Sequence, residues 1–114
     1  MRVIIAGSRY INDYSEVVAA MRDCGFAATE VVCGMARGVD LLGWTWAQER
    51  GLPCRQFPAD WAKHGKAAGP IRNREMAKNA DALVAVWDGK SRGTADMIRA
   101  AREMGLKVFV RKGR

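Results

Sequence analysis

Four short segments combine glycine with arginine, and each follows an apolar run and leads into a segment with helical periodicity. They span residues 7–9, 34–38, 69–73 and 88–94. Glycine lets the backbone turn closely and expose its amides, and a guanidinium group binds phosphate or carboxylate through parallel hydrogen bonds. Helix N-termini favour the same anionic groups. We therefore expect these segments to form a site for a phosphorylated or otherwise anionic ligand.

Two of these segments lead to side chains suited to the rest of such a ligand. Asp40 follows Gly38 in the first turn of a predicted helix, where the helix dipole favours an acid. It is predicted to accept a hydrogen bond from a ligand hydroxyl, and a first-turn acid without a ligand is the alternative. Ser91, Thr94 and the amides around Gly93 are predicted to cradle a phosphate, and a simple helix-capping turn is the alternative.

Arg72 is expected in the first turn of a helix that begins at Pro70. A cation at that place opposes the helix dipole, so stability alone does not favour it. Function explains this arginine better, and we predict that Arg72 and Asn73 face the ligand.

The segment 58–69 places about a dozen residues between a strand and the next helix, and connections of this length tend to be functional. It is predicted to cover the ligand with Asp60 and Trp61. An equally weighted alternative is that Trp61 folds back against the edge of the core. The residues predicted to contact the ligand are Gly7, Ser8, Arg9, Gly34, Met35, Ala36, Gly38, Asp40, Asp60, Trp61, Arg72, Asn73, Asp88, Ser91, Gly93 and Thr94.

Several common chemistries lack their residues in this sequence. Neither the G-x-G-x-x-G dinucleotide motif nor the G-x-x-x-x-G-K-[ST] loop occurs. His64 is the only histidine, which leaves a serine triad or a histidine-based metal site little to build on. Cys24, Cys33 and Cys54 show no C-x-x-C spacing and are expected to be buried thiols. We expect no metal and no cofactor.

Valine-rich apolar runs, typical of strands buried on both faces of a parallel sheet, recur along the chain. They occupy residues 3–6, 31–33, 82–87 and 108–110, with a weaker run at 55–57. Helical segments alternate with them. This alternation predicts an α/β fold, with residues 1–114 as a single Rossmann-like three-layer α/β/α domain. We expect about five parallel strands in the order 3-2-1-4-5, whose following loops meet at one edge of the sheet.

The chain has 114 residues and a net charge of +7. A basic balance is compatible with nucleic acid, because phosphate contacts release counterions. Much of the excess positive charge lies in the C-terminal quarter, where a solvated helix face accounts for it, and the rest lies beside the glycine segments.

The longest apolar run, 82–87, is far shorter than the roughly 20 residues that cross a bilayer. A cytoplasmic protein with no membrane partner is therefore expected.

The chain resembles the SLOG superfamily, and most closely its small branch related to YspA and cpYpsA (DUF2493-like), in residues 7–9, 34–40, 72–76 and 91–94. The most family-specific part is residues 57–61 followed by 65–73. The resemblance implies a Rossmann-like sheet that binds a nucleotide or a nucleotide-derived compound of the ADP-ribose or NAD type. It also implies a role as a sensor or sequestering module for that small ligand.

The similarity to the LOG branch of the superfamily implies an alternative activity. LOG enzymes hydrolyse the N-glycosidic bond of nucleoside monophosphates and tend to dimerise, so a phosphoribohydrolase that forms a homodimer is the second hypothesis. Arg72 and Met76 match one LOG motif, and residues 93–94 match another.

One LOG residue is missing from the chain. The position of the LOG glutamate, three residues after Thr94, holds Met97. Asp96, one residue earlier, points about 100° away on a helix. Because cleavage through an oxocarbenium-like centre needs a nearby carboxylate, this departure disfavours an enzyme. If the chain is an enzyme, the catalytic candidates are Arg72 paired with Asp96 or Glu75.

The similarity to the DprA/Smf branch lies in residues 34–40 and 72–74 and implies binding of single-stranded DNA. The sequence shows none of the extra domains of that branch. Two of its four tryptophans fall within a predicted helix at 39–50 rather than along a groove. DNA binding therefore ranks third, after ligand binding and hydrolysis.

Overall fold

The computed structural model describes residues 1–113, and the final residue, Arg114, lies outside the described part. Five strands form one sheet in the order β3-β2-β1-β4-β5, and all neighbouring pairs are parallel. The predicted fold class and strand order are confirmed. The strands are β1 (Arg2–Gly7), β2 (Glu30–Cys33), β3 (Cys54–Gln56), β4 (Ala82–Trp87) and β5 (Lys107–Lys112).

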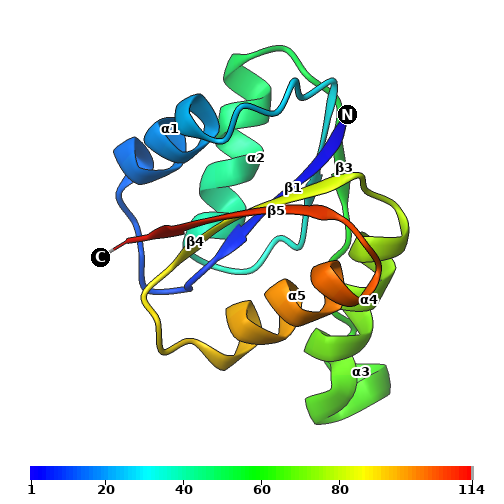
Figure 1. The fold of residues 1–114 in the computed structure, drawn as a ribbon. Coiled ribbons are helices and arrows are strands. Elements are labelled where there is room, and N and C mark those ends of the chain that lie inside the picture. Colours follow the sequence, from blue (N-terminus) through cyan, green and yellow to red (C-terminus); the bar gives the residue numbers. More distant parts are fainter. Residues whose placement is uncertain (114) are drawn as a thin grey trace.

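Helices cover both faces of the sheet, as Figure 1 shows. The layer of α1 and α2 packs on one face, and the layer of α4 and α5 packs on the other. Within residues 1–113, no helix combines the length and the apolar character that a bilayer crossing requires. The helical elements are α1 (Tyr14–Asp23), α2 (Val39–Glu49), α3 (Trp61–His64), the 3-10 turn η1 (Gly65–Ala67), α4 (Ala68–Lys78) and α5 (Arg92–Glu103).

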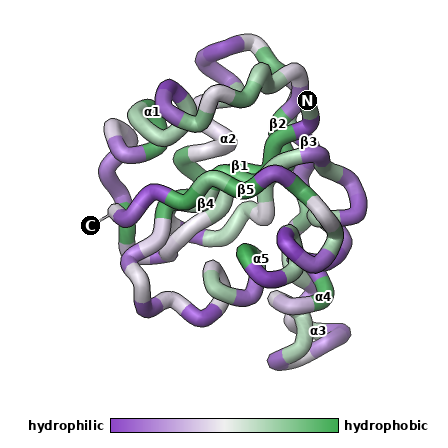
Figure 2. The backbone as a smooth tube through the Cα atoms, viewed as in Figure 1, coloured by the Kyte–Doolittle hydropathy of each residue, from purple (hydrophilic) through white to green (hydrophobic). Residues whose placement is uncertain are grey.

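The central strands β1, β2 and β4 are mostly apolar on both sides because each side meets a helical layer. In β1, Val3 and Ile5 belong to the core cluster beneath α1 and α2, whereas Ile4 and Ala6 belong to the cluster beneath α4 and α5. Figure 2 shows the hydrophobic strands in the middle of the molecule and hydrophilic residues along the outer helices and loops. The two core clusters stabilise the sheet, so the loops at the ends of the strands can carry polar groups.

Local signals set where two of the helices begin. Asp13 caps α1 by accepting a hydrogen bond from the amide of Ser15 at 3.0 Å. Gly38 precedes α2 with a φ of 78°, and a Cβ there would lie 2.5 Å from the carbonyl oxygen of Ser8. Only glycine fits both the conformation and the contact. This close approach joins the loop before α2 to the loop after β1.

The segment 58–69 differs from the open loop that its length predicts. Asp60 caps α3 with its side chain, and η1 carries the chain directly into α4. Pro70 falls in the first turn of α4, where its missing amide costs no intrahelical hydrogen bond. The third glycine segment is therefore helical. Arg72 lies in the second turn of α4, so the prediction of a cation in the first turn is wrong.

The three cysteines are free thiols. Cys33 is fully buried, as predicted, whereas Cys24 and Cys54 are half-buried. The Sγ atoms of Cys33 and Cys54 lie 2.9 Å apart across β2 and β3, and burial raises the pKa of both thiols. Thiols held protonated in this way are poor nucleophiles, so they serve the packing of the sheet.

Candidate functional site

The strand order reverses between β1 and β4, and open α/β sheets bind ligands where such a reversal occurs. Two cavities, of about 570 and 740 Å³, lie at this place. We refer to them as the first and the second cavity, and to both together as the cleft. The two cavities share a wall formed by Arg9, Ala36, Arg72, Asn73, Arg92 and Gly93.

Most of the residues predicted to contact a ligand border the cleft. The exceptions are Ser8, Gly38 and Asp60, which border neither cavity. Gly38 instead packs against the backbone of Ser8, and Asp60 caps α3. These three residues therefore shape the loops around the cleft without lining it.

The three candidate catalytic residues are not brought together as a group. Arg72 borders both cavities, and Asp96 borders the second. The side chain of Asn73 lies between them, because it accepts a hydrogen bond from Arg72 Nε at 3.0 Å and donates one to Asp96 at 3.0 Å. Glu75 borders neither cavity and pairs with Lys78 at 3.6 Å on the surface of α4. It lies outside the cleft, and a direct pair with Arg72 is not formed.

Asp40, at the start of α2, is buried and borders the first cavity. Its carboxylate accepts hydrogen bonds from the amides of Gly7 and Ala36, both at 3.3 Å. Burial raises the pKa of Asp40 to about 6, while the nearby guanidinium of Arg72 acts in the opposite direction. A carboxylate offers about four acceptor positions, so Asp40 can still accept a hydrogen bond from a ligand hydroxyl.

Arg72 extends from α4 into the wall between the two cavities. Its Nη1 donates to the carbonyl oxygen of Gly34 at 2.6 Å, and its Nε donates to Asn73. Burial lowers the pKa of Arg72 and the nearby Asp40 raises it, but an arginine stays charged in a protein. Its Nη2 makes no hydrogen bond to another group among residues 1–113. The guanidinium is thus fixed on two sides and open to a ligand on the third.

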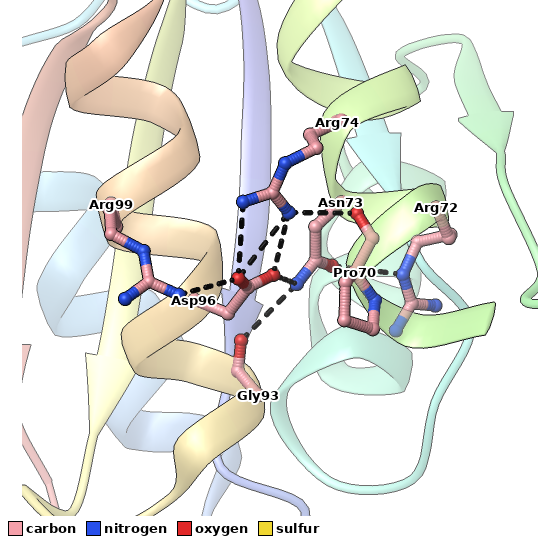
Figure 3. Close-up of polar contacts among 7 residues, drawn as sticks. All are labelled: Pro70, Arg72, Asn73, Arg74, Gly93, Asp96 and Arg99. Atoms are coloured by element: carbon pink, nitrogen blue, oxygen red, sulfur yellow. Dashed lines mark hydrogen bonds and ion pairs between the residues drawn. The ribbon is translucent and has the colours of Figure 1, made fainter. Parts of the chain in front are cut away.

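A polar network anchored on Asp96 joins α4 to α5 (Figure 3). Asn73 donates to this carboxylate and also to the carbonyl oxygen of Gly93 at 3.3 Å. Arg74 and Arg99 pair with the same carboxylate at 3.1 and 3.0 Å. Burial acts to raise the pKa of Asp96, but these hydrogen bonds outweigh it and lower the pKa. Asp96 therefore stays ionised and holds the two helices that flank the second cavity.

The loop after β4 is shaped by its own side chains and by Ser8. The Asp88 carboxylate accepts hydrogen bonds from the amides of Lys90 and Ser91, both at 2.8 Å, and these bonds lower its pKa. The fully buried hydroxyl of Ser8 accepts a hydrogen bond from the Asp88 amide at 3.0 Å. Ser8 thus joins the loops after β1 and β4.

The beginning of α5 is left open toward the cleft. Ser91 occupies the N-cap position, but its side chain makes no capping hydrogen bond and instead accepts one from the Thr94 hydroxyl at 3.2 Å. The amides of residues 92–94 donate no hydrogen bond to another group among residues 1–113. Free amides at a helix N-terminus form a ready site for an anion.

Four cations without an acidic partner surround this opening. Arg9, Arg37, Lys90 and Arg92 are exposed, and none forms an ion pair within residues 1–113. Arg9 and Arg92 border both cavities, Lys90 borders the first, and Arg37 borders the second. Their charges are available to an anionic ligand.

The sequence of residues 1–64 matches the family model described as YspA, cpYpsA-related SLOG, abbreviated YAcAr. The chain belongs to the YAcAr family. The resemblance to the SLOG superfamily predicted from the glycine motifs is thereby confirmed. The matched range of the YAcAr model includes the loops after β1, β2 and β3, whereas α4 and α5 lie beyond it.

Two further comparisons place this YAcAr chain among known proteins. It is 36% identical over 117 residues to the Gene 61 protein of Mycobacterium phage D29, across 95% of this chain and 94% of that protein. Its fold is similar to the X-ray structure of DNA processing protein A (DprA) from Streptococcus pneumoniae, with a TM-score of 0.79 and 18% identity. That likeness covers 99% of this chain and 50% of the DprA chain. At this identity the likeness shows a common fold.

Some residues that border the cleft of this YAcAr domain are absent from the predicted set. Tyr10 and Met97 border the first cavity, and Arg99 borders the second. Asp96 and Arg99 lie three residues apart on α5, and this spacing was the one feature of the sequence that indicated the ion pair between them. Met97 places a thioether where LOG enzymes have a glutamate. Among residues 1–113, no three His, Cys, Asp or Glu side chains gather in a group that could hold a metal ion.

Proposed function

We propose that this YAcAr domain binds a nucleotide or a nucleotide-derived ligand, of the ADP-ribose or NAD type, in the cleft and acts as a sensor or sequestering module. One observation carries the proposal: the open amides at the start of α5 border the first cavity, where the unpaired Arg9 and Arg92 belong to the wall shared with the second cavity. Helix N-terminal amides and guanidinium groups both favour phosphate. The phosphate of the ligand would therefore lie against the start of α5.

Other groups in the cleft suit the remaining parts of a nucleotide. The Asp40 carboxylate would accept a hydrogen bond from a ribose hydroxyl, and the free Nη2 of Arg72 would contact a second anionic group. The cavities, of about 570 and 740 Å³, are of the size that encloses small ligands. This assignment requires no metal.

A thermal-shift screen with AMP, NAD and ADP-ribose tests the proposal. A ligand that binds only the folded chain raises the midpoint of unfolding in a concentration-dependent way. We expect that rise in the wild type and a smaller rise in the double variant Arg9→Gln, Arg92→Gln. Arg102→Gln is the matched control, because Arg102 is an exposed arginine of α5 that borders neither cavity of the cleft. No shift with any nucleotide would contradict the proposal.

A second candidate function is hydrolysis of an N-glycosidic bond, which the ionised Asp96 beside the second cavity favours. A carboxylate near the sugar stabilises the positive charge that develops as the bond breaks. Arg74 and Arg99 already neutralise this carboxylate, which weakens the candidate.

Chromatography of each stabilising mixture decides between ligand binding and hydrolysis. Release of free base that is lost in Arg72→Ala and Asp96→Asn would identify a hydrolase, and recovery of intact ligand would identify a binding module.

Binding of single-stranded DNA is the third candidate. It is favoured by the unpaired cations around the cleft and by the fold shared with DprA, whose name describes it as a DNA processing protein. Affinity that rests on phosphate contacts falls steeply as salt rises. Titration with a short single-stranded oligonucleotide at two salt concentrations tests this candidate. Stabilisation by the oligonucleotide without any response to mononucleotides would favour it over the first proposal.

A further inference from the structure

We propose that the second cavity is the base subsite of the cleft, and that the indole of Trp61 is the surface on which the nucleobase of the ligand stacks. This inference rests on the proposed function, because it presupposes a nucleotide in the cleft. It adds the position of the base and the residue that recognises it.

Trp61 is 55% exposed although tryptophan is usually well buried in folded proteins. It packs with neither of the two core clusters, so the alternative that it folds back against the core edge is wrong. It borders the second cavity together with the apolar residues Pro58, Ala59 and Pro70. An exposed aromatic group beside apolar residues at a cavity is typical of a binding surface.

The local structure restricts the positions open to the indole. Trp61 begins α3, whose N-terminus is capped by the Asp60 side chain through a hydrogen bond from the amide of Lys63 at 3.1 Å. The edge of the indole lies over Gly69 in α4, where a Cβ would be 3.5 Å from the ring atom Cη2. A ring restricted in this way loses less freedom when a base stacks on it, so binding costs less entropy.

Met35 adds an adaptable apolar side chain to the same cavity. Its φ of 62° is the one positive value of a non-glycine residue within residues 1–113. The turn is held by the next amide, because Ala36 donates a hydrogen bond to Asp40 at 3.3 Å. Strained residues of this kind are frequent at ligand clamps, and a thioether makes favourable contacts with aromatic rings.

Charge places the second cavity beside the proposed phosphate position. Arg9, Arg92 and Gly93 belong to the wall that it shares with the first cavity, and the unpaired Arg37 also borders it. A nucleotide whose phosphate contacts this wall can therefore direct its base toward Trp61.

The first cavity suits a base less well. Its exposed aromatic group, Tyr10, is 77% exposed, and its side chain makes no hydrogen bond within residues 1–113. The residues that border this cavity alone include the charged Asp40, Asp88 and Lys90 and the hydroxyl groups of Ser91 and Thr94. These surroundings suit hydroxyl and phosphate groups rather than the flat face of a base.

Isothermal titration calorimetry with AMP and with ribose 5-phosphate tests the inference, because the second probe has no base. Replacing a stacking aromatic residue by alanine weakens binding by about 5- to 150-fold per base. We expect Trp61→Ala to weaken AMP binding within this range and to leave ribose 5-phosphate binding unchanged. Trp61→Phe should retain most of the AMP affinity, since phenylalanine also offers a flat face. Met104→Ala, which removes an exposed apolar side chain away from the cleft, is the control.

The outcomes separate this inference from the proposed function. If AMP binds the wild type and Trp61→Ala equally well, the proposed function stands and the base subsite is overturned. Loss of AMP affinity in Tyr10→Ala but not in Trp61→Ala would overturn it too, by placing the base in the first cavity. If neither probe binds the wild type, both the proposed function and the inference fall. An unchanged midpoint of thermal unfolding in the variants confirms that they are folded.

Discussion

The guanidinium of Arg72 donates from Nη1 to the carbonyl oxygen of Gly34 at 2.6 Å, which joins α4 to the loop after β2 across 38 residues of sequence. A Cβ at position 34 would lie 2.7 Å both from this Nη1 and from the Asp40 carboxylate. The absence of a side chain at Gly34 thus leaves room for the half-buried cation of Arg72 and the buried anion of Asp40. The wall between the two cavities depends on that space.

Replacing Gly34 by alanine should therefore disturb both stability and binding. We expect Gly34→Ala to lower the free energy of unfolding by about 1 to 3 kcal/mol, because the added methyl group forces Arg72 or Asp40 to move. Urea denaturation measures this change. Gly69→Ala is the control, since a Cβ there makes only an ordinary contact of 3.5 Å with Trp61. Equal stability of the two variants would show that position 34 tolerates a side chain.

Asp40 should make the stability of the protein depend on pH between about 4 and 6. Its pKa is raised from 3.8 to about 6, so the folded state binds a proton more tightly than the unfolded chain does. The stabilising contribution is complete below pH 3.8 and is lost as the pH rises through 6. The loss amounts to roughly 3 kcal/mol at most. Urea denaturation at a series of pH values measures it.

Asp40→Asn should remove this dependence, because asparagine has no proton to lose. The other shifted carboxyl groups act in a different window. Their pKa values are all lowered, so their contributions are present above the usual carboxyl pKa and are lost only as the pH falls below it; these groups are Asp13, Asp23, Asp81, Asp88 and Asp96. A slope between pH 4 and 6 that persists in Asp40→Asn would show that another group is responsible.

Ser8→Ala should destabilise the protein without removing a ligand contact. The Ser8 hydroxyl is fully buried and accepts the amide of Asp88 at 3.0 Å. Leaving this amide without a partner should cost about 1 to 3 kcal/mol. Ser15→Ala, on the exposed surface of α1, should cost less. Denaturation compares the two variants, and calorimetry with AMP should show similar affinity for wild type and Ser8→Ala under native conditions.

The sheet and the loops that surround the cleft were predictable from the sequence because their signals are local. The valine run of β4 is buried on both faces, and Gly38 has the positive φ that a tight turn before α2 requires. Alternating strands and helices with right-handed crossovers then leave few arrangements. Most predicted contact residues border the cleft for the same reason, since the loops after parallel strands meet at one edge.

The network around Asp96 was not predictable in the same way, because it depends on how two helices pack. Arg74 and Asp96 are 22 residues apart in sequence, and only the packing of α4 on α5 brings them together. The exposed position of Trp61 depends on α3, which has only four residues. A helix this short shows no helical periodicity in the sequence, so it cannot be told apart from the rest of the connection 58–69. The role of Ser8 was not predictable either. Its position beside Gly7 suggests a residue that contacts the ligand, whereas the structure buries its hydroxyl against the amide of Asp88.

Gly93→Ala separates the stability of α5 from its proposed role in binding phosphate. A Cβ at Gly93 would have nothing within 4 Å, and the backbone there is compatible with alanine. Alanine stabilises a helix relative to glycine by up to about 1 kcal/mol, so the midpoint of thermal unfolding should stay equal or rise.

The methyl group of Gly93→Ala would also stand at the wall shared by both cavities, where the phosphate of the ligand is proposed to approach the amides of residues 92–94. We therefore expect AMP to bind at least about ten-fold more weakly, a change of about 1.4 kcal/mol. Calorimetry with AMP and a thermal scan of the free protein measure the two effects on the same sample. A stabilised variant with full AMP affinity would mean that the start of α5 does not receive the phosphate.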